Sequence, residues 1–299
     1  MAAASADYQE YDQSTYWAAP VRNFRTSARL HLQHLLFQNT LGYILEPHVE
    51  DSVRGAKQLS VADLGCGNGA WLSDLDRMLS DRGISAKLDG YDINTINFPA
   101  PPFLPQSVSL TKLDVLGELP EELKGTYDIV HVRAFTSIIV NSNLTPLLSA
   151  ALALLKPGGW LQWEESRADT YYVEAPSADT SKTACEAIVR LLQAGGKARG
   201  ANFEFLGGLD GHLKEYGFED VHVQMTNNRK QDLKAWTEDY LMVWEELHVH
   251  FPPKATAPPQ APMTRESWNG MFAKAVKETE DGVVVHQGKI VTAVGRKPM

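Results

Sequence analysis

Residues 61–69 read Val-Ala-Asp-Leu-Gly-Cys-Gly-Asn-Gly, a short apolar run that passes into three glycines at alternate positions. The apolar residues suit a buried parallel strand. The glycines allow backbone angles and close ligand approach that a side chain would prevent. Residues 70–79 carry apolar side chains at helical spacing, so the turn opens onto a helix N-terminus, where free amides favour an anion. The stretch predicts a strand, a ligand-binding turn and a helix.

The glycine spacing distinguishes this turn from two well-known phosphate-binding loops. A dinucleotide fingerprint needs Gly-x-Gly-x-x-Gly, and here the third glycine, Gly69, comes one residue early. A P-loop needs Gly-Lys-Ser or Gly-Lys-Thr, which this turn lacks. The ligand is therefore of another kind.

A second acid follows at the distance expected for a ribose ligand. Residues 87–93, Lys-Leu-Asp-Gly-Tyr-Asp-Ile, indicate a second strand that ends at Asp92, 23 positions after Gly69. A carboxylate at the end of this strand accepts hydrogen bonds from both ribose hydroxyls in nucleotide-binding folds. We interpret Asp92 as the ribose ligand, the alternative being a solvated acid at a strand end.

Three further segments continue the pattern in order. Residues 108–115 alternate apolar and polar side chains and include Asp114, and residues 127–133 read Tyr-Asp-Ile-Val-His-Val-Arg. Residues 154–165, Leu-Leu-Lys-Pro-Gly-Gly-Trp-Leu-Gln-Trp-Glu-Glu, indicate a helix end, a turn and a fifth strand. Together with Asp-x-Gly-x-Gly-x-Gly from Asp63 to Gly69, these segments resemble the class I S-adenosylmethionine-dependent methyltransferases.

The resemblance implies a cofactor, S-adenosyl-L-methionine, and S-adenosyl-L-homocysteine as its product. In that family the glycine turn wraps the amino-acid end of the cofactor, the acid at Asp63 helps to hold its ammonium group, and the acid at Asp114 binds the adenine amino group beside the amide of Val115. The predicted cofactor site consists of Asp63, Gly65, Cys66, Gly67, Asn68, Gly69, Asp92, Ile93, Asp114, Val115, His131, Arg133 and Tyr16. For Arg133 the predicted ligand is the cofactor carboxylate or a substrate acid, and a surface cation is an equal alternative.

A narrower resemblance concerns fungal enzymes. Residues 29–37, residues 41–47 and the Leu-Lys-Pro-Gly-Gly-Trp-Leu-Gln-Trp-Glu stretch are similar to fungal methyltransferases that include the LaeA-like and related natural-product tailoring enzymes. The similar segments cover most of residues 22–165 and a final strand near the C-terminus. This resemblance implies a small-molecule natural product as substrate.

Alternating strands and helices predict an α/β fold. Strands at 59–64, 86–92, 108–115, 127–133 and 160–165 alternate with helical segments, which favours a parallel sheet with helices on both faces. The resemblance implies a Rossmann-like seven-stranded sheet of order 3-2-1-4-5-7-6, with the last strand, 289–296, antiparallel between the fifth and sixth. Other expected elements are a strand at 218–226, an extended loop at 252–262 and helices at 28–45, 180–194, 209–216, 232–248 and 264–279.

We expect one domain over residues 1–299. Within it, residues 1–45 form a helical lid, residues 46–165 form the cofactor-binding core, and residues 166–299 supply helices of a substrate cap and the last two strands. For Tyr16, Trp17 and Arg22 in the lid we consider two alternatives: they contact the cofactor or substrate, or they only pack on the protein surface.

Composition limits the classes of function. The chain has 43% hydrophobic residues, as in an ordinary globular protein, and its net charge of −9 argues against non-specific nucleic-acid binding. Two cysteines offer neither a disulfide framework nor a zinc cluster, and His31 and His34 lack a third metal ligand at motif spacing, so no metal is expected. Without a signal peptide or an apolar run of membrane-spanning length, the prediction is a cytoplasmic monomer or homodimer with no membrane partner.

Methyl transfer needs alignment of a nucleophile and exclusion of water, and a phenol, acid or alcohol acceptor also benefits from a general base. His131, at the end of the fourth strand, is the first candidate for the general base, and its alternative is a packing role. Glu164 and Glu165 are competing candidates for the same role. A carboxylate at their position could instead bind an amine substrate. The proposed substrate-contacting residues are Trp17, Trp163, Trp236, Tyr240 and Trp244. The last three share one helix face, a pattern that usually marks core.

The sequence predicts a methyltransferase acting on a small molecule, with oxygen slightly ahead of nitrogen or sulfur as acceptor. Two alternatives stay open: a regulatory, partner-binding protein resembling LaeA, and a cyclase that keeps the cofactor without transferring methyl.

Overall fold

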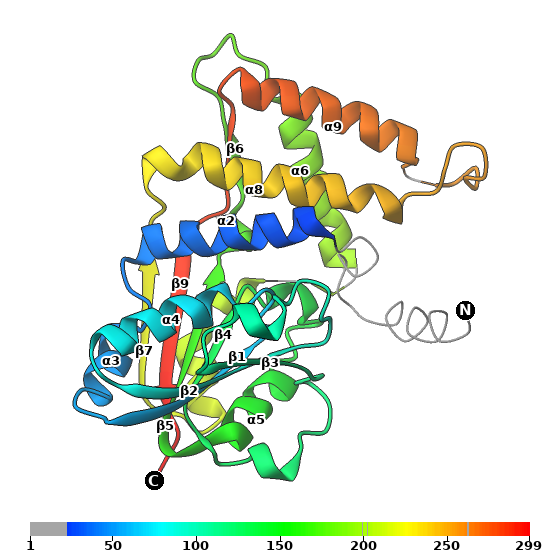
Figure 1. Ribbon diagram of the computed structural model, residues 1–299. Helices are drawn as coiled ribbons and strands as arrows, with labels where there is room; N and C mark the ends of the chain where they lie inside the picture. Colours follow the sequence, from blue (N-terminus) through cyan, green and yellow to red (C-terminus); the bar gives the residue numbers. More distant parts are fainter. Residues whose placement is uncertain (1–22, 199, 202, 262) are drawn as a thin grey trace.

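The computed structural model describes residues 23–198, 200–201, 203–261 and 263–299. A seven-stranded sheet with strand order β3-β2-β1-β4-β5-β9-β7 forms its centre (Figure 1). The bounds of these strands are β1 Gln58–Leu64, β2 Ser85–Asp92, β3 Val108–Lys112, β4 Tyr127–Arg133, β5 Leu155–Ser166, β7 Glu219–Thr226 and β9 Ile290–Arg296. Since β6 and β8 form a separate sheet, β7 and β9 are the sixth and seventh strands of the central sheet. The α/β fold and the order 3-2-1-4-5-7-6 are confirmed.

Strand direction brings the predicted site together. Strands β1 to β5 pair in parallel, whereas β9 is antiparallel to both β5 and β7, as expected for the last strand. The carboxyl ends of parallel strands share one edge of the sheet. The turn after β1, Asp92 of β2 and Arg133 of β4 therefore lie at the same edge.

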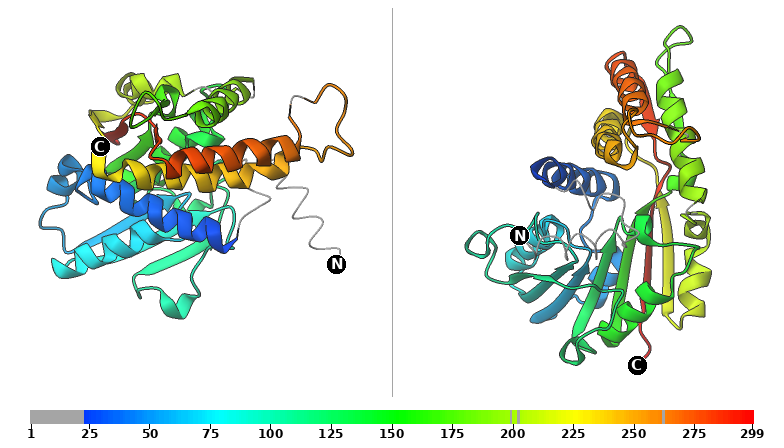
Figure 2. Two further views of the ribbon diagram at one scale, coloured as in Figure 1. Left: turned by 90° about the horizontal axis from the view of Figure 1, so that it is seen from above. Right: turned by 90° about the vertical axis from the view of Figure 1, so that its right-hand side faces the viewer.

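Helices cover both faces of the sheet and extend beyond its end (Figures 1 and 2). The first group packs on the sheet and comprises α3 Pro47–Ser52, α4 Ala70–Asp81, α5 Thr145–Leu154 and α7 Leu209–Glu215. The second group stands beyond the strand ends and comprises α2 Phe24–Leu41, α6 Thr183–Ala198, α8 Leu233–Glu246 and α9 Arg265–Glu280. We call α6, α8 and α9 the cap helices.

The two faces of the sheet differ in chemistry. On the face under α5 and α7, alternate strand residues such as Leu64, Val132 and Leu161 join one apolar core. On the face under α3 and α4, apolar residues lie toward the start of the strands, and a row of buried polar residues crosses the sheet near the strand ends. That row comprises Asp63, His131, Gln162, Glu164 and Thr292.

Several element boundaries differ from the expected ones. The helix predicted at 28–45 is divided: α2 ends at Leu41 and is capped by Gly42, whose φ of 78° is left-handed, and α3 begins at Pro47. The third strand ends at Lys112 rather than at residue 115. A two-stranded sheet of β6, Tyr172–Glu174, and β8, Val284–His286, was not expected, because three-residue strands show too little alternation to detect.

The cap helices have an apolar core of their own. It includes Cys185 of α6, Trp244 of α8, and Trp268 and Ala275 of α9. Helix α2 is joined to this layer, since Phe37 and Trp236 of α8 pack edge to face with ring centroids 5.6 Å apart. Helix α2 thus packs on a cap helix while its other side faces the strand ends.

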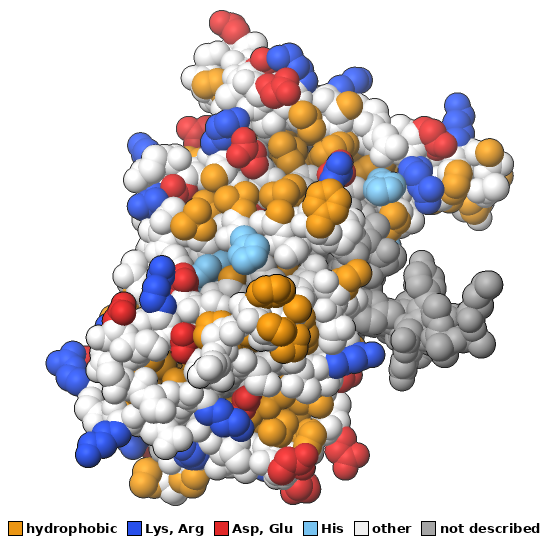
Figure 3. Space-filling model, in the orientation of Figure 1, with side chains coloured by type: hydrophobic (Ala, Val, Ile, Leu, Met, Phe, Trp, Pro, Cys, Tyr) orange, Lys and Arg blue, Asp and Glu red, His pale blue; other side chains and the backbone are white. Residues whose placement is uncertain are grey.

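The surface shows no region of one dominant charge on the face seen in Figure 3, where acidic and basic side chains are interspersed and hydrophobic ones gather over the cap helices and near the middle. In the described part of the chain, no helix has the length and apolar character needed to cross a bilayer.

Candidate cofactor site

The glycine turn follows β1 and is held by the neighbouring strand. The amides of Gly65 and Cys66 both donate to the carbonyl of Tyr91 in β2, at 2.8 and 3.0 Å. Gly65, Gly67 and Gly69 all have φ between 59° and 73°, a left-handed conformation that side chains disfavour. A Cβ at Gly65 would lie 2.8 Å from the ring of Phe135. The left-handed conformation expected of the three glycines is present, and at Gly65 the neighbouring Phe135 ring also excludes a side chain.

Asp92 organises the turn from the end of β2. It is 7% exposed; its Oδ2 accepts a hydrogen bond from the amide of Gly67 at 3.0 Å and its Oδ1 from that of Asn94 at 2.9 Å. The acid predicted as the ribose ligand therefore lies against the turn. Ile93, next in sequence, is half-buried beside it.

Asp114 lies beyond the end of β3 with an exposed side chain. Its Oδ1 accepts a hydrogen bond from the amide of Leu116 at 3.0 Å, while Val115 is buried. The segment after β3 is linked to the end of β2 by the hydrogen bond from the amide of Leu113 to the carbonyl of Asp92 at 3.0 Å. Gly65–Gly69, Asp92 and Asp114 therefore follow or end the neighbouring strands β1, β2 and β3, respectively.

Helix α2 closes over the turn. Asn68 is 5% exposed; its side-chain amide donates to the carbonyl of Ser27 at 3.2 Å, and its Oδ1 accepts from the amide of Ala70 at 3.2 Å. Leu30 of α2 lies 3.0 Å from the position that a Cβ of Gly67 would occupy. These contacts hold the first turns of α2 directly against the glycine turn.

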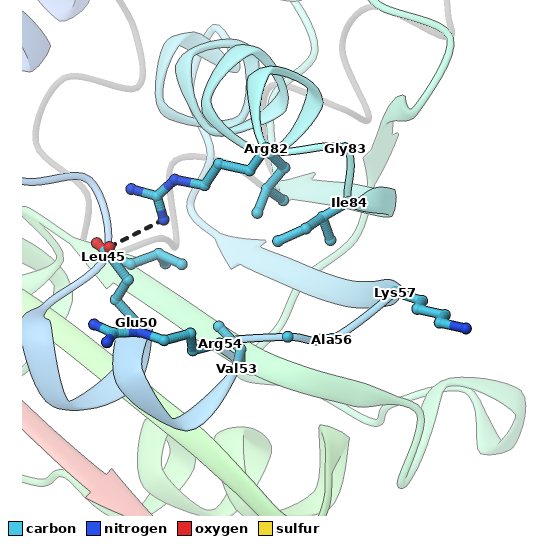
Figure 4. Close-up of a pocket in the computed structure, with 11 residues that line it drawn as sticks. Leu45, Glu50, Val53, Arg54, Ala56, Lys57, Arg82, Gly83 and Ile84 are labelled. Carbon is cyan, nitrogen blue, oxygen red and sulfur yellow. Dashed lines mark ion pairs between the residues drawn. The ribbon is translucent and has the colours of Figure 1, made fainter.

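Two of the hollows on the described part of the molecule lie next to the segments that flank β1 and β2. One has a volume of about 430 Å³ and lies between α2 and the segment after β2. Its described lining residues include Asn68, Ser27, His31, Asn97 and Phe98, and none of them is an acid, lysine or arginine. The other, of about 260 Å³, lies at the amino ends of β1 and β2, where Arg82 pairs with Glu50 at 3.0 Å above apolar Leu45 and Ile84 (Figure 4). Only the first adjoins the glycine turn.

Among the described residues, no group of three or more His, Cys, Asp and Glu side chains is arranged to hold a metal ion.

The sequence pattern of a family described as a methyltransferase domain matches residues 29–223, more than half of the chain. The chain belongs to the methyltransferase domain family.

Fungal relatives of this methyltransferase domain share moderate identity. The chain is 32% identical over 171 residues to methyltransferase grgD of a Penicillium species, covering 56% of this chain and 57% of that protein. It is 30% identical over 138 residues to N-methyltransferase tcpN of Claviceps purpurea, covering 46% and 47%. It is 26% identical over 156 residues to N-methyltransferase verN of Clonostachys rogersoniana, covering 52% of each. The aligned part spans about half the length of these curated relatives.

His131 of the methyltransferase domain is enclosed on all sides. It is 1% exposed, its ring stacks on Trp71 with centroids 3.6 Å apart, and its Nδ1 donates to Oδ1 of Asp63 at 2.7 Å. Its Nε2 lies 3.5 Å from Oε2 of Glu164. Asp63 therefore binds Nδ1 of His131 beneath the turn, whereas Nε2 has no hydrogen-bond partner among the described residues. The burial and stacking of the ring correspond to the packing alternative for His131.

Glu164 is paired with Arg133. The carboxylate is fully buried, its Oε2 lies 2.7 and 2.5 Å from Nε and Nη2 of Arg133, and its Oε1 accepts from the side-chain amide of Gln162 at 2.7 Å. Burial alone would raise the pKa of Glu164, but the charges of Arg133 and His131 overcome it and lower that pKa to about 2. Arg133 is thus an internal ion-pair partner rather than a surface cation.

Glu165 faces the other side of the sheet. Its carboxylate accepts hydrogen bonds from the amides of Phe135 and Thr136 at 2.5 and 3.0 Å and from the indole of Trp163 at 2.9 Å. Burial raises its pKa to about 7, although these hydrogen bonds oppose the shift. Glu165 fixes the segment after β4. Strand alternation, which sends Glu164 and Glu165 to opposite faces, is the sequence signal that separates their roles.

Three of the tryptophans proposed as substrate contacts, Trp163, Trp236 and Trp244, are core residues. Trp163 is fully buried and packs near Phe205, while Trp236 and Trp244 are 1% and 2% exposed in the interior of the α2 and cap layers. Tyr240 is partly buried and its hydroxyl bonds that of Tyr171 at 2.8 Å. The helix-face pattern therefore reflects packing. The predictions for Tyr16, Trp17 and Arg22 lie outside the described residues.

The bridging role of His34 between two other elements was not predicted from the sequence. This side chain of α2 joins Asp74 of α4 to Arg133 of β4, at 3.0 Å on each side. Its helical neighbours gave no sign of these partners, which lie 40 and 99 residues away.

Proposed function

We propose that this protein transfers the methyl group of S-adenosyl-L-methionine to a small-molecule acceptor of fungal natural-product metabolism. The observation that carries the proposal is the left-handed glycine turn that opens beside the buried carboxylate of Asp92. Membership of the methyltransferase domain family and similarity to fungal methyltransferases support it.

The residues at the strand ends fit such a cofactor. A Cβ at Gly65, Gly67 or Gly69 would lie 2.8 to 3.0 Å from a neighbouring side chain, so the turn keeps its close, left-handed path only with glycine. A carboxylate at the end of the second strand binds ribose hydroxyls in related nucleotide folds, and Asp92 has that position. Asp114 is exposed and free to accept from an adenine amino group, beside the amide of Val115. When bound, the cofactor supplies a methyl group on a positively charged sulfur. The protein's task is to hold the acceptor in line with that methyl and exclude water.

The buried carboxylates and histidine bear on the acceptor. The general-base candidates His131, Glu164 and Glu165 are each no more than 1% exposed. Both carboxylates accept hydrogen bonds from other side chains or amides, and Nδ1 of His131 bonds Asp63. A phenol or alcohol needs its proton removed, whereas a neutral amine attacks through its lone pair without a base. Two of the relatives are named N-methyltransferases. We therefore place nitrogen ahead of oxygen as the acceptor atom.

The hollow beside Asn68 gives the acceptor a neutral, partly aromatic surface, since Phe24, Ile96 and Phe98 line it together with polar side chains. Apolar walls with a few polar groups suit a small organic molecule. We assign the acceptor to this side of the glycine turn.

The decisive experiment is methyl transfer from labelled cofactor. The purified protein is incubated with S-adenosyl-L-methionine carrying a deuterated methyl group and a small-molecule extract of the producing organism, and products are analysed by mass spectrometry. We expect one compound to gain the labelled methyl, with fragmentation that assigns it to nitrogen. The Asp92→Asn variant is the matched control. Cofactor binding without any labelled product would overturn methyl transfer and leave a regulatory or cyclase role.

A further inference from the structure

Helix α2 connects the cap helices to the cofactor core. One side packs on α8 through the rings of Phe37 and Trp236. The same side also makes polar contacts with α8, such as the hydrogen bond from Thr26 to Glu246. The other side meets the core mainly through Ser27, Leu30 and His34, which follow one another at three- and four-residue intervals and so share a helix face. The residues that touch the glycine turn thus lie directly next to His34.

The hydrogen bonds of His34 define its protonation. Nη1 of Arg133 lies 3.0 Å from Nδ1 of His34, and a guanidinium can only donate, so Nδ1 carries no proton. Nε2 lies 3.0 Å from Oδ2 of Asp74, and a carboxylate accepts, so the proton of the neutral ring is on Nε2. Docked α2 therefore requires His34 in one neutral tautomer.

A second proton on His34 would conflict with this arrangement. It would point an N–H at Arg133, which is held in place by Glu164 and by the ring of Phe37, 4.9 Å from the guanidinium carbon. The charges facing His34 come from Asp74 and Arg77 of α4, Arg133 and His131 of β4, and, behind Arg133, Glu164 of β5. Asp74 favours the charged ring but also pairs with Arg77 at 3.1 Å. Burial, followed by the charge of Arg133, lowers the pKa of His34.

We propose that neutral His34 is the positioning residue that latches α2 onto the glycine turn, and that its protonation loosens α2 and weakens cofactor binding. The identity of the cofactor rests on the proposed function, whereas the latch itself does not. Because α2 also carries α8, release at His34 separates the cap from the core at the cofactor site.

The first test compares cofactor affinity at two pH values. The dissociation constant of S-adenosyl-L-homocysteine is measured for wild type, His34→Gln and His212→Gln, whose histidine lies on the distant helix α7. Glutamine keeps one donor and one acceptor and does not titrate. For wild type and His212→Gln, we expect the constant to rise about tenfold or more from about pH 8 to about pH 5. For His34→Gln we expect at most about a twofold rise. A wild-type pH response in His34→Gln would overturn the latch.

The second test needs no cofactor. Amide hydrogen exchange of residues 24–41 is measured at both pH values and corrected for the intrinsic pH dependence of exchange. We expect protection of α2 to fall at low pH in wild type and to stay constant in His34→Gln. Equal protection at both pH values in wild type would overturn the proposal. If the protein binds no cofactor at any pH, the proposed function fails, and this measurement still decides the latch.

Discussion

The Nδ1 atom of His131 lies 2.7 Å from Oδ1 of Asp63, the acid of the glycine motif, on the neighbouring strand. Asp63 is 4% exposed and His131 is 1% exposed, so the pair is inside the protein and not at an open surface. The carboxylate is thereby fixed beneath the turn that it precedes.

Replacing His131 tests this pair. His131→Phe keeps a ring to stack on Trp71 but removes the donor to Asp63, which leaves a buried carboxylate without that partner. We expect the free energy of unfolding in urea to fall by about 3 kcal/mol, and the double variant with Asp63→Asn to recover about 1 kcal/mol of this loss. A single variant as stable as wild type would show that the pair contributes nothing.

Asp92→Asn should weaken cofactor binding. The variant keeps the shape of the side chain but loses the charge that accepts from the amide of Gly67 and, in our proposal, from the ribose hydroxyls. We expect the calorimetric dissociation constant of S-adenosyl-L-methionine to rise about tenfold to hundredfold. Asp210→Asn, at an exposed position of α7, serves as control and should bind like wild type. Unchanged affinity in Asp92→Asn would remove the ribose assignment.

Alanine substitutions at two glycines distinguish the cost of backbone strain from the cost of a steric clash. Gly65 and Gly125 are both left-handed, with φ of 73° and 63°, but a Cβ at Gly65 would meet the Phe135 ring at 2.8 Å, whereas nothing lies within 4 Å of one at Gly125. Gly125→Ala should lower the free energy of unfolding by about 1 kcal/mol through strain alone. Gly65→Ala should cost about 1–3 kcal/mol more. Thermal unfolding followed by circular dichroism gives both values, and equal losses would contradict the crowding.

The sequence predicts the sheet far better than the roles of the acids at its edge. The first strand is followed by a glycine, the second ends in an acid, and all five parallel strands follow one another in the order of their motifs, so that order fixes which residues meet at the strand ends. Whether a strand-end acid faces a ligand or an internal partner depends on residues far away in the chain. Glu164 meets Arg133 and Glu165 meets the amide of Phe135, 31 and 30 residues away, and neither spacing is periodic.

The same limit applies to the cap. The aromatic stripe on α8 is visible in the sequence, but a stripe looks alike whether it lines a pocket or fills a core. Trp236 became a core residue because Phe37 of α2 lies against it. The pairing of these two helices is decided by tertiary packing and not by the periodicity of either one.

Asp239 gives a pH-dependent prediction in the layer between α2 and α8. It is 2% exposed, and its Oδ1 accepts no hydrogen bond from the described residues. Burial raises its pKa from 3.8 to about 7, with the charge of Glu246 acting in the same direction and that of Arg29 opposing it. Because the folded protein favours the protonated acid, this stabilisation is complete below the ordinary value and is lost as the pH rises through about 7.

Asp239→Asn removes that dependence, since an amide does not titrate. At about pH 8 we expect the variant to be about 1–3 kcal/mol more stable than wild type in urea unfolding, and the difference to vanish near pH 4. Glu165, with a pKa also raised to about 7, adds the same trend to both proteins, so only their difference reports on Asp239. Glu238→Gln, at the adjacent exposed position, should show no such change. A variant less stable than wild type at about pH 8 would contradict this prediction. It would mean that the attraction between charged Asp239 and Arg29 stabilises the folded protein more than burial of that charge destabilises it.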